Sequence, residues 1–411
     1  MKLKYLIVSI MAMLMLSACG SGTDKPAENP DNPVEAPGKP TAPDTGTGDG
    51  DTEAPCVGCP TPTPSPEDPV EEDPDLEEPT PDPGPTPGHT NNNYYPYQWH
   101  LHSRHSASWA DNDAGSYVDQ AWKASNKGNG IIIAVIDSGF DQYHEDLVDN
   151  VYDTYNAGNG SKDVSLEAGD QRHGTQVAGL IAGSDNGFGV MGSAPNARLI
   201  LIKLAPNQQA IINAFRYAKE HGAKVISCSW GTKNITDVTK NILKEMKDAD
   251  IVTLFACGND GASLDQPGIN DECEDTSVIG ISSSSEKNKI TSYGNYGKNV
   301  DFLAPAGEYG LITIDDIGDD GFNKDQLNTL KNKDYTFFAG TSAATPVAAG
   351  IVGLMRSTGH YANPDTVYNA LRSGAEKIGE VSYDNTGWND TYAYGKINAE
   401  KSVKKIQAFD P

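Results

Sequence analysis

Residues 131–139 have the sequence Ile-Ile-Ile-Ala-Val-Ile-Asp-Ser-Gly. Their first six side chains are all apolar, which is typical of a strand buried on both faces of a parallel sheet. Similar apolar runs recur along the chain, at 199–202, 225–227, 251–255 and 278–281. Stretches with helical spacing lie between them, at 209–221 and 236–247. This alternation predicts an α/β fold of three layers, a mostly parallel central sheet flanked by helices.

Functional residues of such sheets gather beyond the carboxyl ends of the strands. Asp137 directly follows the first run, His173 opens a helix rich in small residues, and Ser342 opens another after Gly-Thr. Alone, the aspartate could be a helix cap or a metal ligand, and the histidine a structural residue. Together they suit nucleophilic catalysis, because a serine hydroxyl needs a neighbouring base to become a good nucleophile.

The motifs that contain these residues occur in the order Asp, His, Ser, and they resemble the subtilisin-like serine protease family, peptidase S8. The resemblance spans about residues 94–405. It implies a subtilisin-like fold and a serine endopeptidase in which Ser342 forms an acyl-enzyme, His173 moves the proton and Asp137 orients the histidine. The competing class is a catalytically silent binding module on the same scaffold. Four separated residues with complementary roles, the fourth being Asn259, favour the enzyme.

The resemblance also assigns residues that would contact the substrate. Asn259 would donate its side-chain amide to the oxyanion, although Asn-Asp-Gly alone is typical of a turn. Two segments that follow strands would line the P1 pocket: Ser229, Trp230 and Gly231, and opposite them Ala256, Cys257 and Gly258. Asp271 would lie near its floor and Asp260 follows Asn259, and carboxylates there would favour Lys or Arg at P1. A solvated acidic loop is an equally good interpretation.

A structural calcium site is a further implication of the resemblance. Its oxygen ligands would be the carboxylate of Asp146, the amide of Asn186 and the carbonyl groups of Ser184, Phe188 and Val190, with Gln98 as a candidate N-terminal ligand. Residues 94–411 contain three cysteines, and we expect Cys257 to pair with Cys273 and brace the pocket loop. Cys228 would then be a buried thiol, although sequence alone does not fix the connectivity.

Two loops depart in length from the family pattern. The segment 204–209 is shorter than the family's substrate-binding loop. The segment 308–336 is longer, contains six aspartates, and is expected to form a lid or a surface loop.

The N-terminus has the form of a signal peptide over residues 1–18, with Lys2 and Lys4 before an apolar run. Leu-Ser-Ala-Cys at 16–19 resembles a bacterial lipobox, which implies cleavage before Cys19 and a diacylglycerol on its sulfur. An ordinary secretory peptide is the alternative. Because no aspartate follows Cys19, we expect the outer membrane as the location in a Gram-negative host.

Residues 19–93 separate this signal from the aromatic-rich start of the catalytic domain, expected over 94–411. They hold 18 of the 26 prolines and 17 acids against two lysines, so they predict a disordered acidic tether. Cys56 and Cys59 lie within it without a second CxxC motif or a pair of histidines, which favours a local disulfide or no role over a redox function.

The whole chain of 411 residues has a formal charge of −26. Nucleic acids and anionic surfaces are therefore poor electrostatic partners. We expect protein or peptide substrates outside the cytoplasm, a membrane contact through the lipid on Cys19, and a monomer.

Overall fold

The computed structural model describes residues 94–103, 109–167, 170, 172–323, 330, 332–360 and 363–409. The predicted signal peptide, the lipidation site Cys19 and the tether lie outside the described residues. In the part of the chain that is described, no helix is long and apolar enough to cross a membrane.

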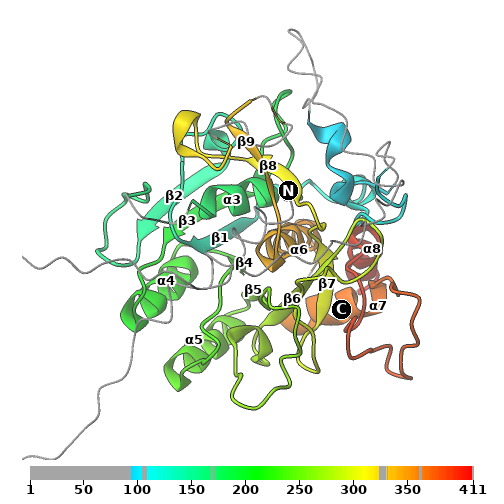
Figure 1. The fold of residues 1–411 in the computed structure, drawn as a ribbon. Coiled ribbons are helices and arrows are strands. Elements are labelled where there is room, and N and C mark those ends of the chain that lie inside the picture. The colour runs from blue at the N-terminus through cyan, green and yellow to red at the C-terminus, as the bar shows by residue number, and fades with distance from the viewer. Residues whose placement is uncertain are drawn as a thin grey trace, which may run out of the picture. The chain divides into compact units, whose positions relative to one another are not determined.

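A parallel sheet of seven strands forms the centre of the fold, in the order β2-β3-β1-β4-β5-β6-β7 (Figure 1). Every neighbouring pair is parallel. In chain order the strands are β1 (Ile132–Asp137), β2 (Val151–Asn156), β3 (Arg198–Lys203), β4 (Val225–Cys228), β5 (Val252–Ala256), β6 (Ile279–Ser284) and β7 (Phe302–Pro305). The predicted α/β class is confirmed.

Helices cover both faces of this sheet. They are α2 (Val118–Ala121), α3 (Gly174–Ala182), α4 (Gln208–Glu220), α5 (Asp237–Asp248), α6 (Thr341–Arg356), α7 (Pro364–Gly374) and α8 (Ala399–Ala408). Short 3-10 turns occur at Tyr95–Tyr97, Trp99–Leu101, Val148–Asn150, Glu272–Glu274 and Gly318–Asp320. Helices α4 and α5 begin where the side chains of Asn207 and Thr236 accept hydrogen bonds from the first-turn N–H groups of Ala210 and Thr239.

Alternate side chains of β1 enter two different cores, which explains its uninterrupted apolar sequence. Ile133 and Val135 pack in the core that contains the buried faces of α3 and α6. Ala134 and Ile136 pack in the core that contains those of α4 and α5. The three predicted layers therefore correspond to two separate apolar cores, one on each side of the sheet.

Small residues in α3 and α6 let these helices lie close to their neighbours. A Cβ on Gly179 of α3 would lie 2.5 Å from Cγ1 of Ile314, and one on Gly353 of α6 would lie 2.8 Å from Cδ1 of Ile133. At both positions a side chain would force a neighbouring side chain to move, so the small residues that follow His173 and Ser342 allow the close packing of these helices.

The segment 308–336, expected to form a lid or a surface loop, begins and ends in strands, and Ile317 and Phe322 between them are exposed. The strands β8 (Leu311–Ile314) and β9 (Tyr335–Phe338) form an antiparallel pair whose apolar side chains are buried, except for the partly buried Phe337. The hydroxyl of Thr313 donates to the carbonyl oxygen of Gln176 in α3 at 2.9 Å. The many aspartates of this segment obscured two short apolar strands, the first of which packs against α3.

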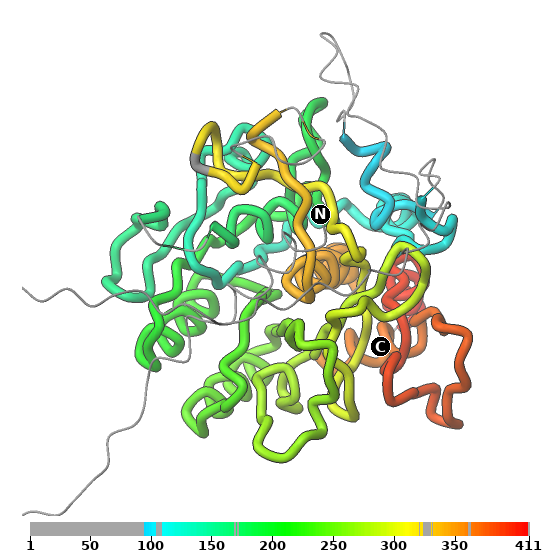
Figure 2. Tube along the Cα trace, in the orientation of Figure 1, coloured from blue at the N-terminus to red at the C-terminus, as the bar shows by residue number. Residues whose placement is uncertain are grey.

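The N-terminal part of the described chain lies beside the C-terminal helix (Figure 2). The side chain of Gln407 in α8 donates to the carbonyl oxygen of Ala124 at 2.8 Å. The buried Lys396 donates to the carbonyl oxygens of Asp113 and Ala114. The segment that precedes β1 is thus tied to the last part of the fold.

Candidate active site

Asp137 and His173 meet at the carboxyl end of β1. Asp137 is the last residue of the strand, and His173 is the N-cap of α3. Nδ1 of the histidine lies 2.9 and 3.0 Å from the two carboxylate oxygens. Since a carboxylate accepts hydrogen bonds, Nδ1 must carry the proton, and Nε2 of the neutral ring is left with a lone pair. The pair is therefore arranged so that His173 can accept a proton at Nε2.

Ser342 lies in the first turn of α6, after Gly340, whose φ of 97° places it in a region that favours glycine. Its Oγ donates to the carbonyl oxygen of Ser229 at 3.3 Å, and no hydrogen bond joins it to His173 within the described residues. The His173 ring instead packs edge-on against Phe338, four residues before the serine, with centroids 5.1 Å apart. Catalytic hydrogen bonds are often formed only when substrate binds.

The side-chain amide of Asn259 is oriented by Thr341. Its Oδ1 accepts hydrogen bonds from the backbone N–H of Thr341 at 2.8 Å and from the Thr341 hydroxyl at 3.1 Å. A backbone N–H can only donate, so the oxygen must face Thr341, and the Nδ2 hydrogens are directed elsewhere. Asn259 is thus fixed as a hydrogen-bond donor close to the start of α6.

The two predicted pocket walls extend from adjacent strands. Ser229, Trp230 and Gly231 follow β4, and Ala256, Cys257 and Gly258 lie at the end of β5, which pairs with β4 in register. Trp230 donates from Nε1 to the carbonyl oxygen of Ile136 at 2.9 Å. The N–H of Gly258 donates to the Thr341 hydroxyl at 3.1 Å. The walls are therefore attached to the strand of Asp137 and to the helix of Ser342.

Cys257 and Cys273 are joined by a disulfide, and Cys228 is a buried free thiol. Burial raises the pKa of the Cys228 thiol well above its usual value. The disulfide links the segment of Asn259 to the turn that contains Asp271, so it spans two parts of the predicted pocket.

Asp260 and Asp271 have different environments. Asp260 is partly exposed and pairs with Lys233 at 2.9 Å. Asp271 is buried against the wall, since a Cβ on Gly231 would lie 2.6 Å from its Oδ1. Burial, with a smaller effect of Glu272, raises the pKa of Asp271 to about 7. Its acceptor contacts are the N–H groups of Lys233 and Cys273. Only the charge of Asp260 is thus matched by a basic side chain.

The predicted calcium ligands are brought together in part. The carboxylate of Asp146 accepts from the side chain of Asn186 at 3.0 Å and from the N–H of Val190 at 2.7 Å. Ser184 and Phe188 belong to the same loop, whereas Gln98 is bonded to Met191 through both its oxygen and its nitrogen. Across the described ranges, no group of three or more His, Cys, Asp or Glu residues could hold a metal ion.

Asp146 is fully buried and forms no ion pair with any described residue. Burial raises the pKa of its carboxyl to about 8. The hydroxyl of Tyr335 has no hydrogen-bond partner among the described residues, and a Cβ on Gly189 would collide with this hydroxyl and with the Asp146 carboxylate. A buried carboxylate without a basic partner among the described residues fits a hard cation in its chemistry, although both of its oxygens accept from N–H groups here.

Sequence reasoning missed three residues that organise this site. Thr341 orients Asn259, Phe338 contacts the His173 ring, and Lys203 bonds the segment that precedes His173. Thr341 and Phe338 stand inside the recognised serine motif, but their roles depend on contacts across the fold. The only sequence signal for Lys203 is a charged residue directly after an apolar run.

Comparison with known proteins agrees with this architecture. The profile of the Subtilase family matches residues 128–395. A thermophilic serine proteinase of Bacillus sp. is 28% identical over 324 residues, covering 72% of this chain and 70% of that protein. A calcium-dependent protease of Trichormus variabilis is 31% identical over 356 residues, covering 77% of this chain and 52% of that protein.

Among solved structures, the serine protease of Aeromonas sobria in complex with a chaperone has a TM-score of 0.69 at 22% identity, over 78% of this chain and 68% of that one. This likeness shows the shared fold. The fold is α/β, and the candidate site contains an Asp-His pair at the end of β1 and a serine in the first turn of α6. The chain belongs to the subtilase family and is a serine endopeptidase.

Proposed function

We propose that this protein cleaves peptide bonds of extracytoplasmic proteins through an acyl-enzyme on Ser342. The observation that carries the proposal is the hydrogen bond of His173 Nδ1 to Asp137, which leaves Nε2 as a base. The N-terminal turns that carry His173 and Ser342 belong to α3 and α6, two helices that pack together.

In the first half of the reaction, Ser342 Oγ bonds to the scissile carbonyl carbon and its proton passes to His173 Nε2. The histidine then gives that proton to the leaving nitrogen as the C–N bond breaks. Water repeats the sequence on the acyl-enzyme and releases the acid product. Asp137 stays ionised and stabilises the imidazolium that forms twice in each cycle.

Two donors suit the oxyanion of each tetrahedral intermediate. The first is Nδ2 of Asn259, whose oxygen is occupied by Thr341. The second is the backbone N–H of Ser342, which lies in the first turn of α6, where N–H groups have no acceptor within the helix. Fixed donors of this kind stabilise negative charge without having to reorganise during the reaction.

Asp271 supports a preference for Lys or Arg at P1. Its carboxylate lies against Gly231, and the like charges of Glu272 and Glu274 act on it. A basic substrate side chain would supply the missing opposite charge. Asp260 contributes less, because Lys233 already pairs with it. A peptide library with all residues at P1 tests this preference, and a dominant apolar P1 would contradict it.

Calcium binding at Asp146 and Asn186 is a further part of the proposal, with the carbonyl groups of Ser184, Phe188 and Val190 as the remaining ligands. It is supported by the buried, unpaired carboxylate and by the relative named as a calcium-dependent protease. The ion would neutralise Asp146 and stabilise the loop. Thermal unfolding with calcium and with a chelator tests this: a rise in Tm with calcium in the wild type should disappear in Asp146→Asn.

The signal at residues 1–18 and Cys19 support attachment of the mature protein to a bacterial membrane by a lipid. Substitution Cys19→Ser should release the protein from the membrane fraction. Unchanged membrane association would contradict lipidation at this cysteine.

Hydrolysis of an unfolded protein substrate tests the proposed activity. The wild type should generate peptides and Ser342→Ala should not, while both give the same far-UV circular dichroism spectrum. A folded wild type without activity in the presence of calcium would favour the binding-module alternative.

A further inference from the structure

Lys203 is the last residue of β3, and its backbone lies beside that of Asp137. The two residues are partners in the parallel register of β1 and β3. The N–H of the next residue, Leu204, donates to the carbonyl oxygen of Asp137 at 2.7 Å. Lys203 is therefore attached by main-chain contacts to the residue that orients His173.

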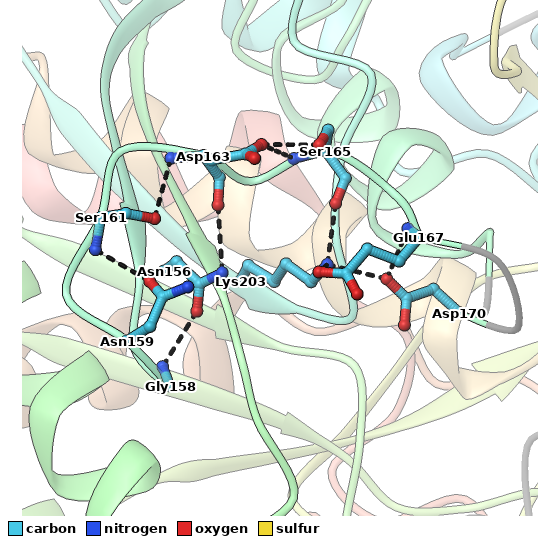
Figure 3. Close-up of polar contacts among 9 residues, drawn as sticks. All are labelled: Asn156, Gly158, Asn159, Ser161, Asp163, Ser165, Glu167, Asp170 and Lys203. Atoms are coloured by element: carbon cyan, nitrogen blue, oxygen red, sulfur yellow. Dashed lines mark hydrogen bonds and ion pairs between the residues drawn. The ribbon is translucent and has the colours of Figure 1, made fainter.

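The side chain of Lys203 binds the segment that leads to His173 (Figure 3). Its Nζ donates to the carbonyl oxygen of Ser165 and to Oδ2 of Asp170, both at 2.8 Å. Glu167 lies at 3.5 Å but is largely exposed. Only 11% of the lysine side chain is exposed, so solvent screens its pair with Asp170 less than an ordinary surface pair.

The same segment is shaped by its own turn bonds before it reaches Lys203 (Figure 3). Asn156, at the end of β2, accepts from the N–H of Gly158 and donates to the carbonyl oxygen of Asp163. Asp163 in turn accepts from the N–H and the hydroxyl of Ser165. These bonds hold the carbonyl group of Ser165 where Nζ of Lys203 binds it.

These contacts close a ring. Strand pairing connects Asp137 to Lys203, and the ion pair connects Lys203 to Asp170. Three residues along the chain from Asp170 is His173, whose Nδ1 is hydrogen-bonded to Asp137. Without the charge of the lysine, Asp170 would lose its contact to β3 and would keep only contacts within its own segment, such as that from the N–H of Glu167.

We propose that Lys203 is a positioning residue that fixes His173 relative to Asp137 by holding Asp170 and the carbonyl group of Ser165. The inference rests on the proposed function, because its effect on rate requires His173 to be the base. Lys203 touches neither substrate nor reacting atoms. Since misplacing a catalytic group by about 1 Å can cost about 10²-fold, loss of the ring reduces turnover more than it weakens substrate binding.

The test compares Lys203→Met, Lys203→Arg and the control Lys162→Met. Lys162 belongs to the same loop and pairs with Asp153 on β2, but its side chain is mostly exposed and does not bond residues 165–170. We expect kcat of Lys203→Met to fall about 10- to 100-fold with KM within about twofold. Lys203→Arg should recover most of the loss, and Lys162→Met should retain wild-type kcat.

Wild-type kcat in a folded Lys203→Met would overturn the inference, as would a loss confined to KM. If that variant does not fold, Asp170→Asn removes the carboxylate and leaves the lysine bound to Ser165. Its kcat should fall by a similar factor, and an unchanged kcat would overturn the inference.

A proton NMR spectrum supplies a readout that needs no turnover. The His173 Nδ1–H proton, which is bonded to Asp137, should give a downfield resonance in the wild type and in Lys162→Met. That resonance should shift or broaden in Lys203→Met. An inactive wild type with this pattern would contradict the proposed function alone, whereas an active wild type whose resonance is unchanged in Lys203→Met would contradict the role of Lys203 alone.

Discussion

Two loops of the candidate active site are held by different chemistry. The loop after β5, which contains Asn259, is closed by the disulfide between Cys257 and Cys273. The loop before α3, which ends at His173, is held by the ion pair of Lys203 with Asp170. A disulfide does not depend on the charge of its partners or on salt, whereas the ion pair depends on both. The side that would bind the acyl group and the oxyanion is therefore covalently braced, and the side that moves the proton is fixed electrostatically.

The largest effect on kcat is expected for Asp137, which accepts the hydrogen bond from Nδ1 of His173. Asp137→Asn should lower kcat about 10⁴-fold, because an asparagine can leave His173 in the wrong tautomer while the geometry stays intact. Steady-state kinetics on a peptide substrate measure the loss. A loss of less than tenfold would mean that Asp137 does not orient the histidine.

On the covalently braced side, Asn259→Ala should lower kcat about 10²- to 10³-fold, the magnitude that removing one oxyanion donor has in subtilisin. KM should change little, because the bond strengthens only in the transition state. Thr341→Val, which removes the hydroxyl bonded to Oδ1 of Asn259, should cost less, since the backbone N–H of Thr341 still holds that oxygen. Equal kcat in Asn259→Ala and wild type would exclude this asparagine from the reaction.

The double substitution Cys257→Ser with Cys273→Ser tests whether the disulfide stabilises the fold without taking part in the reaction. The disulfide closes a loop with a sequence separation of 16 residues. Removing it should lower the unfolding free energy by about 3 kcal/mol, because the unfolded chain becomes less restricted. Urea unfolding at 25 °C measures it. While the variant is folded, its kcat should be close to that of the wild type, and a collapse of kcat without a stability loss would contradict the bracing role.

The smallest effect concerns pH and the buried Asp271. Its pKa is raised to about 7 in the folded state, so the folded protein binds more protons than the unfolded chain between about pH 4 and pH 7. The contribution of Asp271 to the unfolding free energy is therefore present at low pH and is lost as pH rises from about 4 to about 7. Asp271→Asn should flatten the decline in unfolding free energy between pH 4 and 7. An unchanged pH profile would show that Asp271 titrates normally.

The fold could be predicted from sequence for the central strands, because a strand that is buried on both faces of a sheet has a continuous apolar sequence. The runs that became β1, β3, β4, β5 and β6 were all recognised, and the helices α4 and α5 were placed within one or two residues. By contrast, β2 lies at the sheet edge and mixes polar with apolar residues, and β7 has only four residues ending in a proline. Neither has the continuous apolar run that marks a central strand.

The candidate site was predictable for the residues that stand in recognisable motifs. The structure places Asp137 against His173 and puts Asn259 beside Thr341, next to Ser342. Lys203 could not be found in this way, because its partners Ser165 and Asp170 are more than thirty residues away in sequence. The pairing of Lys233 with Asp260, which makes Asp260 a weak candidate for P1 recognition, likewise depends on contacts between separate loops.

Labelling with a fluorophosphonate probe, followed by mass spectrometry of the modified peptide, tests the central claim most directly. We expect stoichiometric modification of Ser342 in the wild type, much weaker labelling in His173→Ala and no labelling in Ser342→Ala. A folded wild type that is not labelled in the presence of calcium, or that is labelled at another residue, would contradict it.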